Sequence, residues 1–251
     1  CMMIQFASDL HLEFSANRNF LDRNPIVPKA EVLVLAGDIV PYARLELASR
    51  FLQRVSGQFT TIYWLAGNHE YYGGDIAAWP ESSLLPDNVI PVRQLSVALG
   101  HTRLIIATLW SKIAPAAAFM IERGINDFHQ IRVGPRPLTV ADFNTLHQQD
   151  LAFIREELTK AGGPAVVVTH HVPTLANYPA AYRGSALNPA FASRAAEELG
   201  PLAPAFWIYG HHHHFVSPFR VGSTTFLTNQ LGYVDRGEHQ NFKPDKVLQF
   251  A

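Results

Sequence analysis

Cysteine is nearly absent from this sequence: the only one among its 251 residues is Cys1. A single cysteine excludes an internal disulfide framework, and it leaves no thiolate to bind a metal in the body of the chain. Any metal that the protein binds must therefore be held by nitrogen and oxygen atoms.

Long hydrophobic runs are absent as well. The longest, such as residues 104–109 and 165–168, have the length of a strand, whereas a membrane-spanning helix needs about 20 apolar residues. The sequence also begins without the basic and long apolar segments of a secretory signal. We therefore expect a cytoplasmic protein that has no membrane partner.

Charge is sparse and balanced. Lys and Arg number 20, Asp and Glu number 21, and charged residues make up 16% of the chain. A protein that binds long nucleic acid usually carries a basic surface, so nucleic acid is the less favoured partner. A small ligand fits this charge better, and the sequence gives no indication of the oligomeric state.

Hydrophobic residues, in contrast, are abundant and follow two periods. They make up 48% of the chain, enough for the core of one α/β domain spanning residues 1–251. Helical spacing predicts helices at residues 44–55 and 140–160, the second with a capping box formed by Thr139 and Asp142. Short apolar runs predict strands at residues 4–7, 32–36, 61–65, 104–109, 165–169 and 205–209.

The last part of the chain changes character. Residues 215–221, 224–228 and 246–250 are short strand-like runs joined by Gly-rich or polar turns, and no helical pattern separates them. We expect these runs to end the chain as a β-meander, as in a protein with two packed sheets.

Five polar clusters each follow a predicted strand. Each cluster alone is more often a turn or a hydrogen-bonded core pair than a set of ligands. Their repeated position at the ends of strands favours one site to which all five contribute. The clusters are Asp9-Leu10-His11, Gly37-Asp38, Gly67-Asn68-His69-Glu70, His170-His171 and Gly210-His211-His212-His213-His214.

These residue types suit a pair of metal ions. Two divalent ions about 3.5 to 4 Å apart can hold the attacking and leaving oxygens of a phosphoryl displacement, and a carboxylate such as Asp38 can bridge them. Imidazole, carboxylate and amide ligands without thiolate favour divalent or trivalent Mn, Fe or Zn. A hydroxide shared by the two ions would attack phosphorus. We expect hydrolysis of a phosphomonoester or phosphodiester, with a small phosphorylated molecule as the substrate.

In this order the clusters resemble the motifs of the calcineurin-like metallophosphoesterases, which are Asp-x-His, Gly-Asp, Gly-Asn-His-(Asp/Glu), His and Gly-His-x-His. The motifs span residues 9–213. The resemblance implies an α/β fold, a four-layer αββα sandwich of two mixed β-sheets flanked by helices. It implies that Asp38 bridges two metals, one bound by Asp9, His11 and His213 and the other by Asn68, His170 and His211.

The same resemblance implies a catalytic role for His69. This residue would act as the general acid for the leaving group, or it would stabilise charge on the phosphoryl group. From its residue type and adjacency, Glu70 is expected to orient the His69 imidazole.

More narrowly, the chain resembles bacterial members of the family that have an Asn-Asp-(Phe/Tyr) segment after the middle strand and an Asn-x-x-Gly-Tyr turn near the end. Here these are residues 126–128 and 229–233. Residues 112–138 are expected to cap one side of the site, where Asp127, His129 and Arg132 would approach a substrate. A solvated loop with a surface arginine is an equally good interpretation.

The histidine ligands, the number of metals and the function each admit a second interpretation. His171 could replace His170, and His212 or His214 would bind if the strand ended in another register, although the family spacing favours the first assignment. A mononuclear zinc site needs only three protein ligands and leaves Asp38 and Asn68 without a role. A non-catalytic metal-binding scaffold of the same fold is the alternative to an enzyme.

Overall fold

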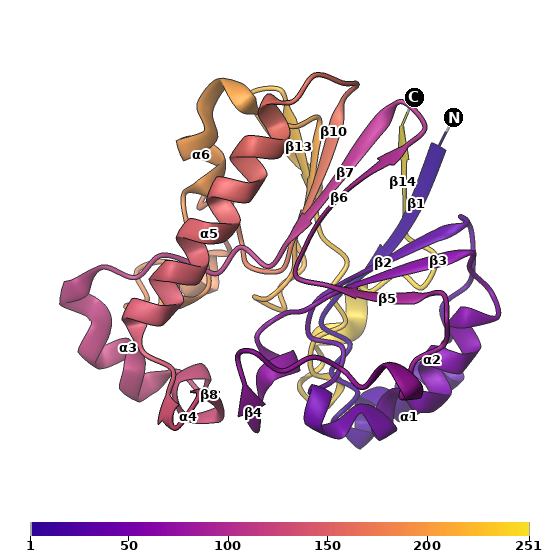
Figure 1. The fold of residues 1–251 in the computed structure, drawn as a ribbon, viewed down its shortest axis with the longest axis horizontal. Helices are drawn as coiled ribbons and strands as arrows, with labels where there is room; N and C mark the ends of the chain where they lie inside the picture. Colours follow the sequence, from indigo (N-terminus) through magenta and orange to yellow (C-terminus); the bar gives the residue numbers. More distant parts are fainter. Residues whose placement is uncertain (1, 251) are drawn as a thin grey trace.

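Two β-sheets packed face to face form the centre of the protein, whose computed structural model describes residues 2–250 (Figure 1). The first sheet has the strand order β14-β1-β2-β3-β5, and the second has the order β12-β13-β11-β10-β7-β6. Both sheets are mixed, because their inner strands are parallel whereas β14, β6 and β12 pair antiparallel at the edges. The strands are β1 (Met2–Ala7), β2 (Val32–Ala36), β3 (Thr61–Leu65), β5 (Val89–Val92), β6 (Gln94–Leu99), β7 (Thr102–Ala107), β10 (Ala165–Thr169), β11 (Phe206–Ile208), β12 (Phe219–Val221), β13 (Thr224–Leu227) and β14 (Val247–Phe250).

Alternation along the strands places apolar side chains on both faces of the first sheet. In β2, Val34 and Ala36 lie in the core between the sheets, and Leu33 and Leu35 lie on the helical side. Successive residues of a strand point to opposite faces. A strand covered on both faces is therefore apolar throughout, which is why the run is continuous in the sequence.

Helices cover the outer faces of the two sheets (Figure 1). The helices α1 (Ser15–Arg23) and α2 (Ser49–Ser56) pack on the first sheet through residues such as Leu21 and Leu52. The helices α5 (Val140–Thr159) and α6 (Ala195–Leu199) pack on the second through residues such as Ile154 and Leu199. The predicted αββα sandwich of two mixed sheets flanked by helices is thus confirmed.

The start of α5 has the predicted capping box. The Asp142 backbone N–H donates to the Thr139 side chain, and the Thr139 backbone N–H donates to the Asp142 carboxylate. These bonds satisfy N–H groups that have no partner within the helix. No helix within residues 2–250 is long and apolar enough to span a membrane.

The predicted β-meander at the end of the chain is wrong. The strands β12 and β13 do form an antiparallel pair, but β13 lies parallel to β11 in the second sheet. The last strand, β14, pairs with β1 in the first sheet. This crossing buries Leu248 and Phe250 between the two sheets, which a continued meander on the second sheet would leave at an edge.

The long connection between β7 and α5 contains short helices and strands. Residues 112–138 contain α3 (Ala118–Gly124), α4 (Asp127–Gln130), β8 (Ile131–Val133) and β9 (Arg136–Pro137). With β4 (Gly74–Asp75), the strands β8 and β9 form a small third sheet. The 3-10 helices are Tyr42–Ala48, His69–Tyr71, Ser82–Leu84, Pro115–Ala117, Ala180–Tyr182, Asn188–Ala190, Gly200–Leu202, Val234–Arg236 and Glu238–Asn241.

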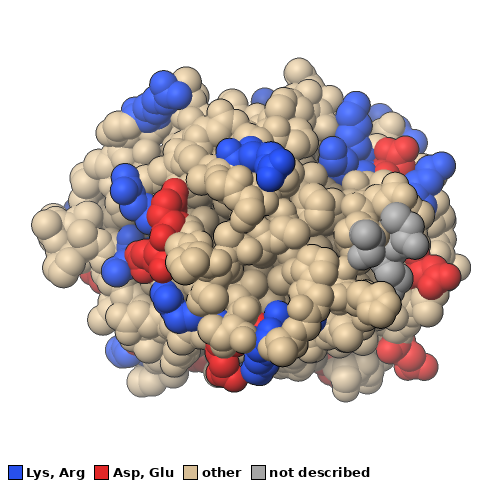
Figure 2. Space-filling view, turned by 90° about the horizontal axis from the view of Figure 1, so that it is seen from above, with Lys and Arg blue, Asp and Glu red and all other residues tan. Residues whose placement is uncertain are grey.

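The termini lie at the upper end of the molecule, away from the segments that follow β1 and β2 (Figure 1). Figure 2 views the molecule from this upper end. Basic and acidic side chains are scattered there, mostly toward the rim, and they do not form one basic surface. This face therefore offers no extended positive surface.

Candidate metal centre

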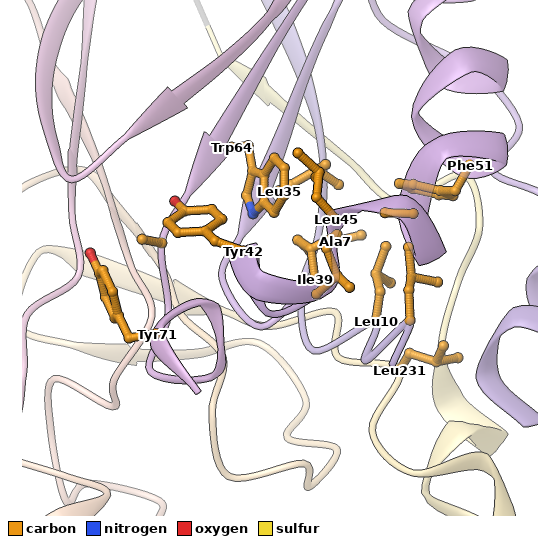
Figure 3. Close-up of a cluster of buried hydrophobic side chains, with 14 of the residues drawn as sticks. Ala7, Leu10, Leu35, Ile39, Tyr42, Leu45, Phe51, Trp64, Tyr71 and Leu231 are labelled. Atoms are coloured by element: carbon orange, nitrogen blue, oxygen red, sulfur yellow. The ribbon is translucent and has the colours of Figure 1, made fainter. Parts of the chain in front are cut away.

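Apolar residues anchor the first two polar clusters in the core (Figure 3). Leu10, between Asp9 and His11, is fully buried on the helical side of the first sheet, and so is Ile39, which follows Asp38. Because these side chains point into the core, the flanking polar side chains are directed elsewhere. The hydrophobic residue inside each motif thus positions its polar neighbours.

Hydrogen bonds tie the ends of the strands together. The Asp9 N–H donates to the Gly37 carbonyl at 2.9 Å, and the His11 N–H donates to the Asp38 carbonyl at 2.9 Å. A hydrogen bond also joins the two sheets, because the His211 backbone N–H donates to the Asp9 side-chain carboxylate at 3.0 Å. The five clusters therefore converge on one place, as the sequence predicts.

The first group of donor atoms comes from Asp9, His11, Asp38 and His213. One donor atom from each lies within 4.8 Å of all the others. The Nε2 atoms of His11 and His213 are 2.8 Å apart, and His213 Nε2 lies 3.3 Å from Asp9 Oδ1.

A second group comes from Asp38, His170 and His211. His170 Nε2 lies 3.2 Å from Asp38 Oδ1 and 3.2 Å from His211 Nδ1. The Asn68 side-chain oxygen joins them at 3.1 Å from His170 Nε2. Asp38 thus belongs to both groups, with a different oxygen directed to His11 and to His170.

The neighbouring histidines lie outside both groups. Both ring nitrogens of His171 are buried without a hydrogen-bond partner within residues 2–250, and the ring packs beside Trp110. The Gln230 side-chain amide bonds to His212 Nδ1 at 3.1 Å, and His214 is exposed. The structure therefore brings His170, His211 and His213 together and leaves their neighbours aside.

The carboxylates of this site favour positive charge among the donor atoms. His170 Nδ1–H donates to the Ala36 carbonyl at 2.9 Å, so Nε2 is the atom that faces Asp38 and Asn68. Burial alone would lower the pKa of His170, but the charge of Asp38 raises it to about 9. Burial would likewise lower the pKa of His213, yet Asp9 and Glu238 raise it to about 10. Metal ions supply such charge, and imidazole, carboxylate and amide donors suit Mn, Fe or Zn.

Unusual backbone conformations are concentrated at this site. Within residues 2–250, seven non-glycine residues have positive φ, and five of them are predicted ligands. Such conformations are uncommon for residues with a side chain and occur often at functional sites. The five are Asp9 (φ 55°), His11 (φ 46°), Asp38 (φ 57°), His211 (φ 77°) and His213 (φ 51°).

The glycines of the motifs allow the clusters to approach one another. A Cβ at Gly67 would lie 2.3 Å from Asp38 Oδ1, and a Cβ at Gly210 would lie 2.5 Å from Asp9 Oδ2. A Cβ at Gly37, whose φ is 92°, would lie 2.3 Å from His170 Nδ1. The glycines before Asp38, Asn68 and His211 are therefore a packing requirement of the site.

The expectation that Glu70 orients His69 is wrong. The Glu70 carboxylate accepts hydrogen bonds from the backbone N–H groups of Asp38, Ile39 and Gly67, and from the Trp64 indole. These bonds join the ends of β2 and β3, and they leave no contact with the His69 ring. Glu70 therefore holds the backbone around Asp38.

Glu13, and not Glu70, is the carboxylate that contacts the His69 ring. Its Oε1 lies 2.9 Å from His69 Nδ1 and 3.0 Å from His11 Nδ1. One carboxylate oxygen thus fixes both rings so that their Nε2 atoms point away from Glu13. The only sequence signal for this contact is the spacing of Glu13 two residues after His11.

Two more carboxylates support the candidate ligands. Glu238 Oε2 lies 3.0 Å from His213 Nδ1. Asp127 accepts a hydrogen bond from the Asn68 side-chain N–H at 2.8 Å, which turns the Asn68 oxygen toward His170. Contacts of this kind orient ligands and tune a metal. Sequence reasoning missed Glu238, and it expected Asp127 to approach a substrate.

The structure does not bring His129 and Arg132 to these groups. Both side chains are exposed, and they bond to nearby backbone carbonyls, of Arg123 for His129 and of Gly134 and Pro135 for Arg132. Neither residue lines the cavity beside the donor groups. Asp127 does line that cavity.

Comparison with known proteins identifies the family of the chain. The family model of the calcineurin-like phosphoesterases matches residues 2–215. The chain is 29% identical to an uncharacterized protein of Acanthamoeba polyphaga mimivirus, over 96% of this chain and 94% of that protein. Its fold is similar to the crystal structure of the phosphopantetheinyl hydrolase of Mycobacterium tuberculosis, with a TM-score of 0.70, 16% sequence identity and coverage of 95% of this chain and 92% of that one. The chain therefore belongs to the calcineurin-like phosphoesterase family.

Proposed function

We propose that the protein is a binuclear metal-dependent phosphohydrolase that cleaves a phosphomonoester or phosphodiester. The observation that carries the proposal is the position of Asp38, which contributes to both donor groups. A shared carboxylate holds two cations close together because its charge offsets their repulsion. Asp9, His11 and His213 would complete one metal site, and Asn68, His170 and His211 would complete the other.

Two such ions, when bound, supply a Lewis acid for the phosphoryl group and lower the pKa of an attacking water. Donors without sulfur favour Mn, Fe or Zn. The protein's own contribution is to fix the donors. Glu13 and Glu238 bind the outer nitrogens of His11 and His213, and the Ala36 carbonyl binds that of His170.

His69 is the residue that we assign to the leaving group. Its Nδ1 is held by Glu13, and its Nε2 lies 4.0 Å from Asp38 Oδ2 and is directed toward the donor groups. Burial alone would lower the pKa of His69, but Asp38 and Glu13 raise it above its usual range. A protonated His69 would donate its Nε2 proton to the leaving oxygen, or stabilise charge on the phosphoryl group.

Metal analysis combined with hydrolysis tests this proposal. The purified protein, loaded with manganese, is analysed for metal and assayed with p-nitrophenyl phosphate and bis(p-nitrophenyl) phosphate. We expect two metals per chain and turnover of at least one ester. Two metals without turnover would favour a non-catalytic scaffold, and less than one metal per chain would overturn the binuclear assignment.

The Asp38→Asn variant separates a binuclear from a mononuclear site. If Asp38 bridges two ions, its replacement weakens both, and the metal content falls toward zero. If the site is mononuclear, the variant loses one metal at most. Asp22→Asn is the matched control, because Asp22 is exposed and pairs with Arg50 and Arg54.

A further inference from the structure

Two cavities meet at His69. The first has a volume of about 430 Å³ and contains the candidate ligands Asp38, Asn68, His211 and His213 in its lining. The second has a volume of about 520 Å³, and no candidate ligand lines it. Both volumes lie in the range of sites that enclose a small organic group. The residues common to both linings are His69, Tyr72, Asn126, Tyr233 and Arg236.

The first cavity has an aromatic wall beyond the donor groups. Tyr178, Tyr182 and Phe191 line it, together with the amide of Asn188. The ring centroids of Tyr178 and Tyr182 are 6.3 Å apart, and that of Phe191 lies 4.9 Å from His211. Aromatic faces with a nearby amide bind flat ring systems by stacking and hydrogen bonding.

The second cavity extends from His69 in another direction. Its lining includes Phe14, Pro41 and Gln130, which lie in three separate segments of the chain. Phe14 is 44% exposed, and its ring meets the Tyr233 ring edge-on with the centroids 5.4 Å apart. This surface suits an organic substituent, because it offers apolar area beside His69 and none of the candidate ligands.

The side chains that line the two cavities supply little positive charge. Among the described residues that line them, Arg236 is the only Lys or Arg, and the carboxylates are those of Glu13, Asp38, Asp127, Asp235 and Glu238. A phosphomonoester carries a charge of about −1.5 to −2 at neutral pH, and a diester carries a single negative charge. Positive charge for either ester would come from the two ions and Arg236, so the choice of a diester rests on the two cavities.

Arg236 lies where the two cavities join. Its guanidinium carbon lies 4.8 Å from the centre of the Tyr233 ring, and it forms no ion pair with any residue in the range 2–250. The guanidinium group is therefore available to a phosphate oxygen held at the junction.

Building on the proposed function, we propose that the substrate is a phosphodiester with an organic group on each side of its phosphate. A ring-bearing group occupies the first cavity, and the second group occupies the cavity lined by Phe14 and Gln130. Hydrolysis adds water across one P–O bond. The oxygen of water bonds to phosphorus, the leaving oxygen takes a proton, and the products are a phosphomonoester and an alcohol.

A variant that fills the second cavity tests this inference. In Gln130→Trp, the larger side chain would occupy the space of the second substituent. The matched control is Gln149→Trp, an equal change at an exposed position of α5 that lines neither cavity. Each manganese-loaded protein is assayed with bis(p-nitrophenyl) phosphate and with p-nitrophenyl phosphate.

We expect the original chain to prefer the diester, with kcat/KM about tenfold higher than for the monoester. Gln130→Trp is expected to lower this ratio about tenfold, and Gln149→Trp is expected to leave it unchanged. If thermal unfolding shows that Gln130→Trp does not fold, Phe14→Ala replaces it. This variant removes an aromatic side chain from the lining of the second cavity, so it is also expected to lower the ratio of diester to monoester kcat/KM.

Two results would overturn the inference while the proposed function stands. One is a preference of the original chain for the monoester, and the other is an equal effect of the cavity-filling change on both esters. If the metal-loaded chain hydrolyses neither ester, the proposed function fails, and this inference fails with it.

Discussion

At the residue scale, the motifs identify the atoms that converge but not the groups that hold them. Their positions after strands predict one site for seven ligands, and the structure brings all seven together: Asp9, His11, Asp38, Asn68, His170, His211 and His213. Glu238 and Asp127 come from segments far from their partners in the sequence, so only the folded chain reveals their contacts. The position of Glu70 next to His69 in the sequence does not predict its partners. A buried carboxylate accepts hydrogen bonds from the backbone N–H groups around it that have no other acceptor.

Glu13 and Glu70 provide a direct comparison of two roles. Glu13→Gln should lower kcat about 10- to 100-fold, because the carboxylate that fixes His69 and His11 is lost. The free energy of unfolding should change little, since one oxygen of Glu13 contacts both rings and Gln keeps an oxygen that can take its place. Steady-state kinetics and urea unfolding measure the two effects.

The matched variant is Glu70→Gln. Gln keeps one of the two oxygens, so either the Asp38 and Gly67 N–H groups or the Ile39 N–H and the Trp64 indole lose their acceptor. The free energy of unfolding should therefore fall by about 1 to 3 kcal/mol. A loss of kcat in Glu70→Gln without loss of stability, or the reverse pattern in Glu13→Gln, would contradict the assignment of the two carboxylates.

Gly67 tests the close approach of the clusters. Gly67→Ala places a methyl group against Asp38, so Asp38 must move and the metal content should fall below that of the original chain. The control is Gly57→Ala, where the nearest atom to the new Cβ is 3.7 Å away and the effect should be small. Elemental analysis measures the metal content of both manganese-loaded variants. An unchanged metal content in Gly67→Ala would show that metal binding does not need the close approach of residue 67 to Asp38.

At the scale of elements, strong patterns predict well and weak ones do not. The strands buried on both faces can be predicted because their runs are continuous and apolar. The helix α1 cannot, because its buried residues are only Asn17 and Leu21, which make no apolar stripe. The strand β6 is equally hard to predict, because its side chains are half-buried and Gly100 turns the chain directly into β7. The place of β14 depends on packing between sheets, which no local pattern encodes.

The capping box of α5 has a measurable effect. Thr139→Ala removes the acceptor for the Asp142 N–H, so the free energy of unfolding should fall by about 1 kcal/mol. Thr145→Ala is the control, because Thr145 lies within the same helix and bonds to the Ala141 carbonyl without capping it. Urea unfolding of the two variants compares them, and equal losses would mean that the cap contributes nothing specific.

At the scale of the whole molecule, the candidate metal centre joins the two sheets. Asp9, His11, Asp38 and Asn68 follow strands of the first sheet, and His170, His211 and His213 follow strands of the second. A metal bound by residues of both sheets binds the folded chain only, because the donors separate when the sheets come apart. Its binding free energy is therefore added to the stability of the entire domain.

Chelation should consequently lower the thermal stability of the whole domain in one transition. At a free manganese concentration about 100 times the Kd, each independent site adds about 2.7 kcal/mol to the free energy of unfolding. Calorimetry with manganese and with a chelator measures the difference, and the metal-dependent part should vanish in Asp38→Asn. If manganese instead stabilised only part of the molecule, two transitions would separate, and the donors of the two sheets would not share their ions.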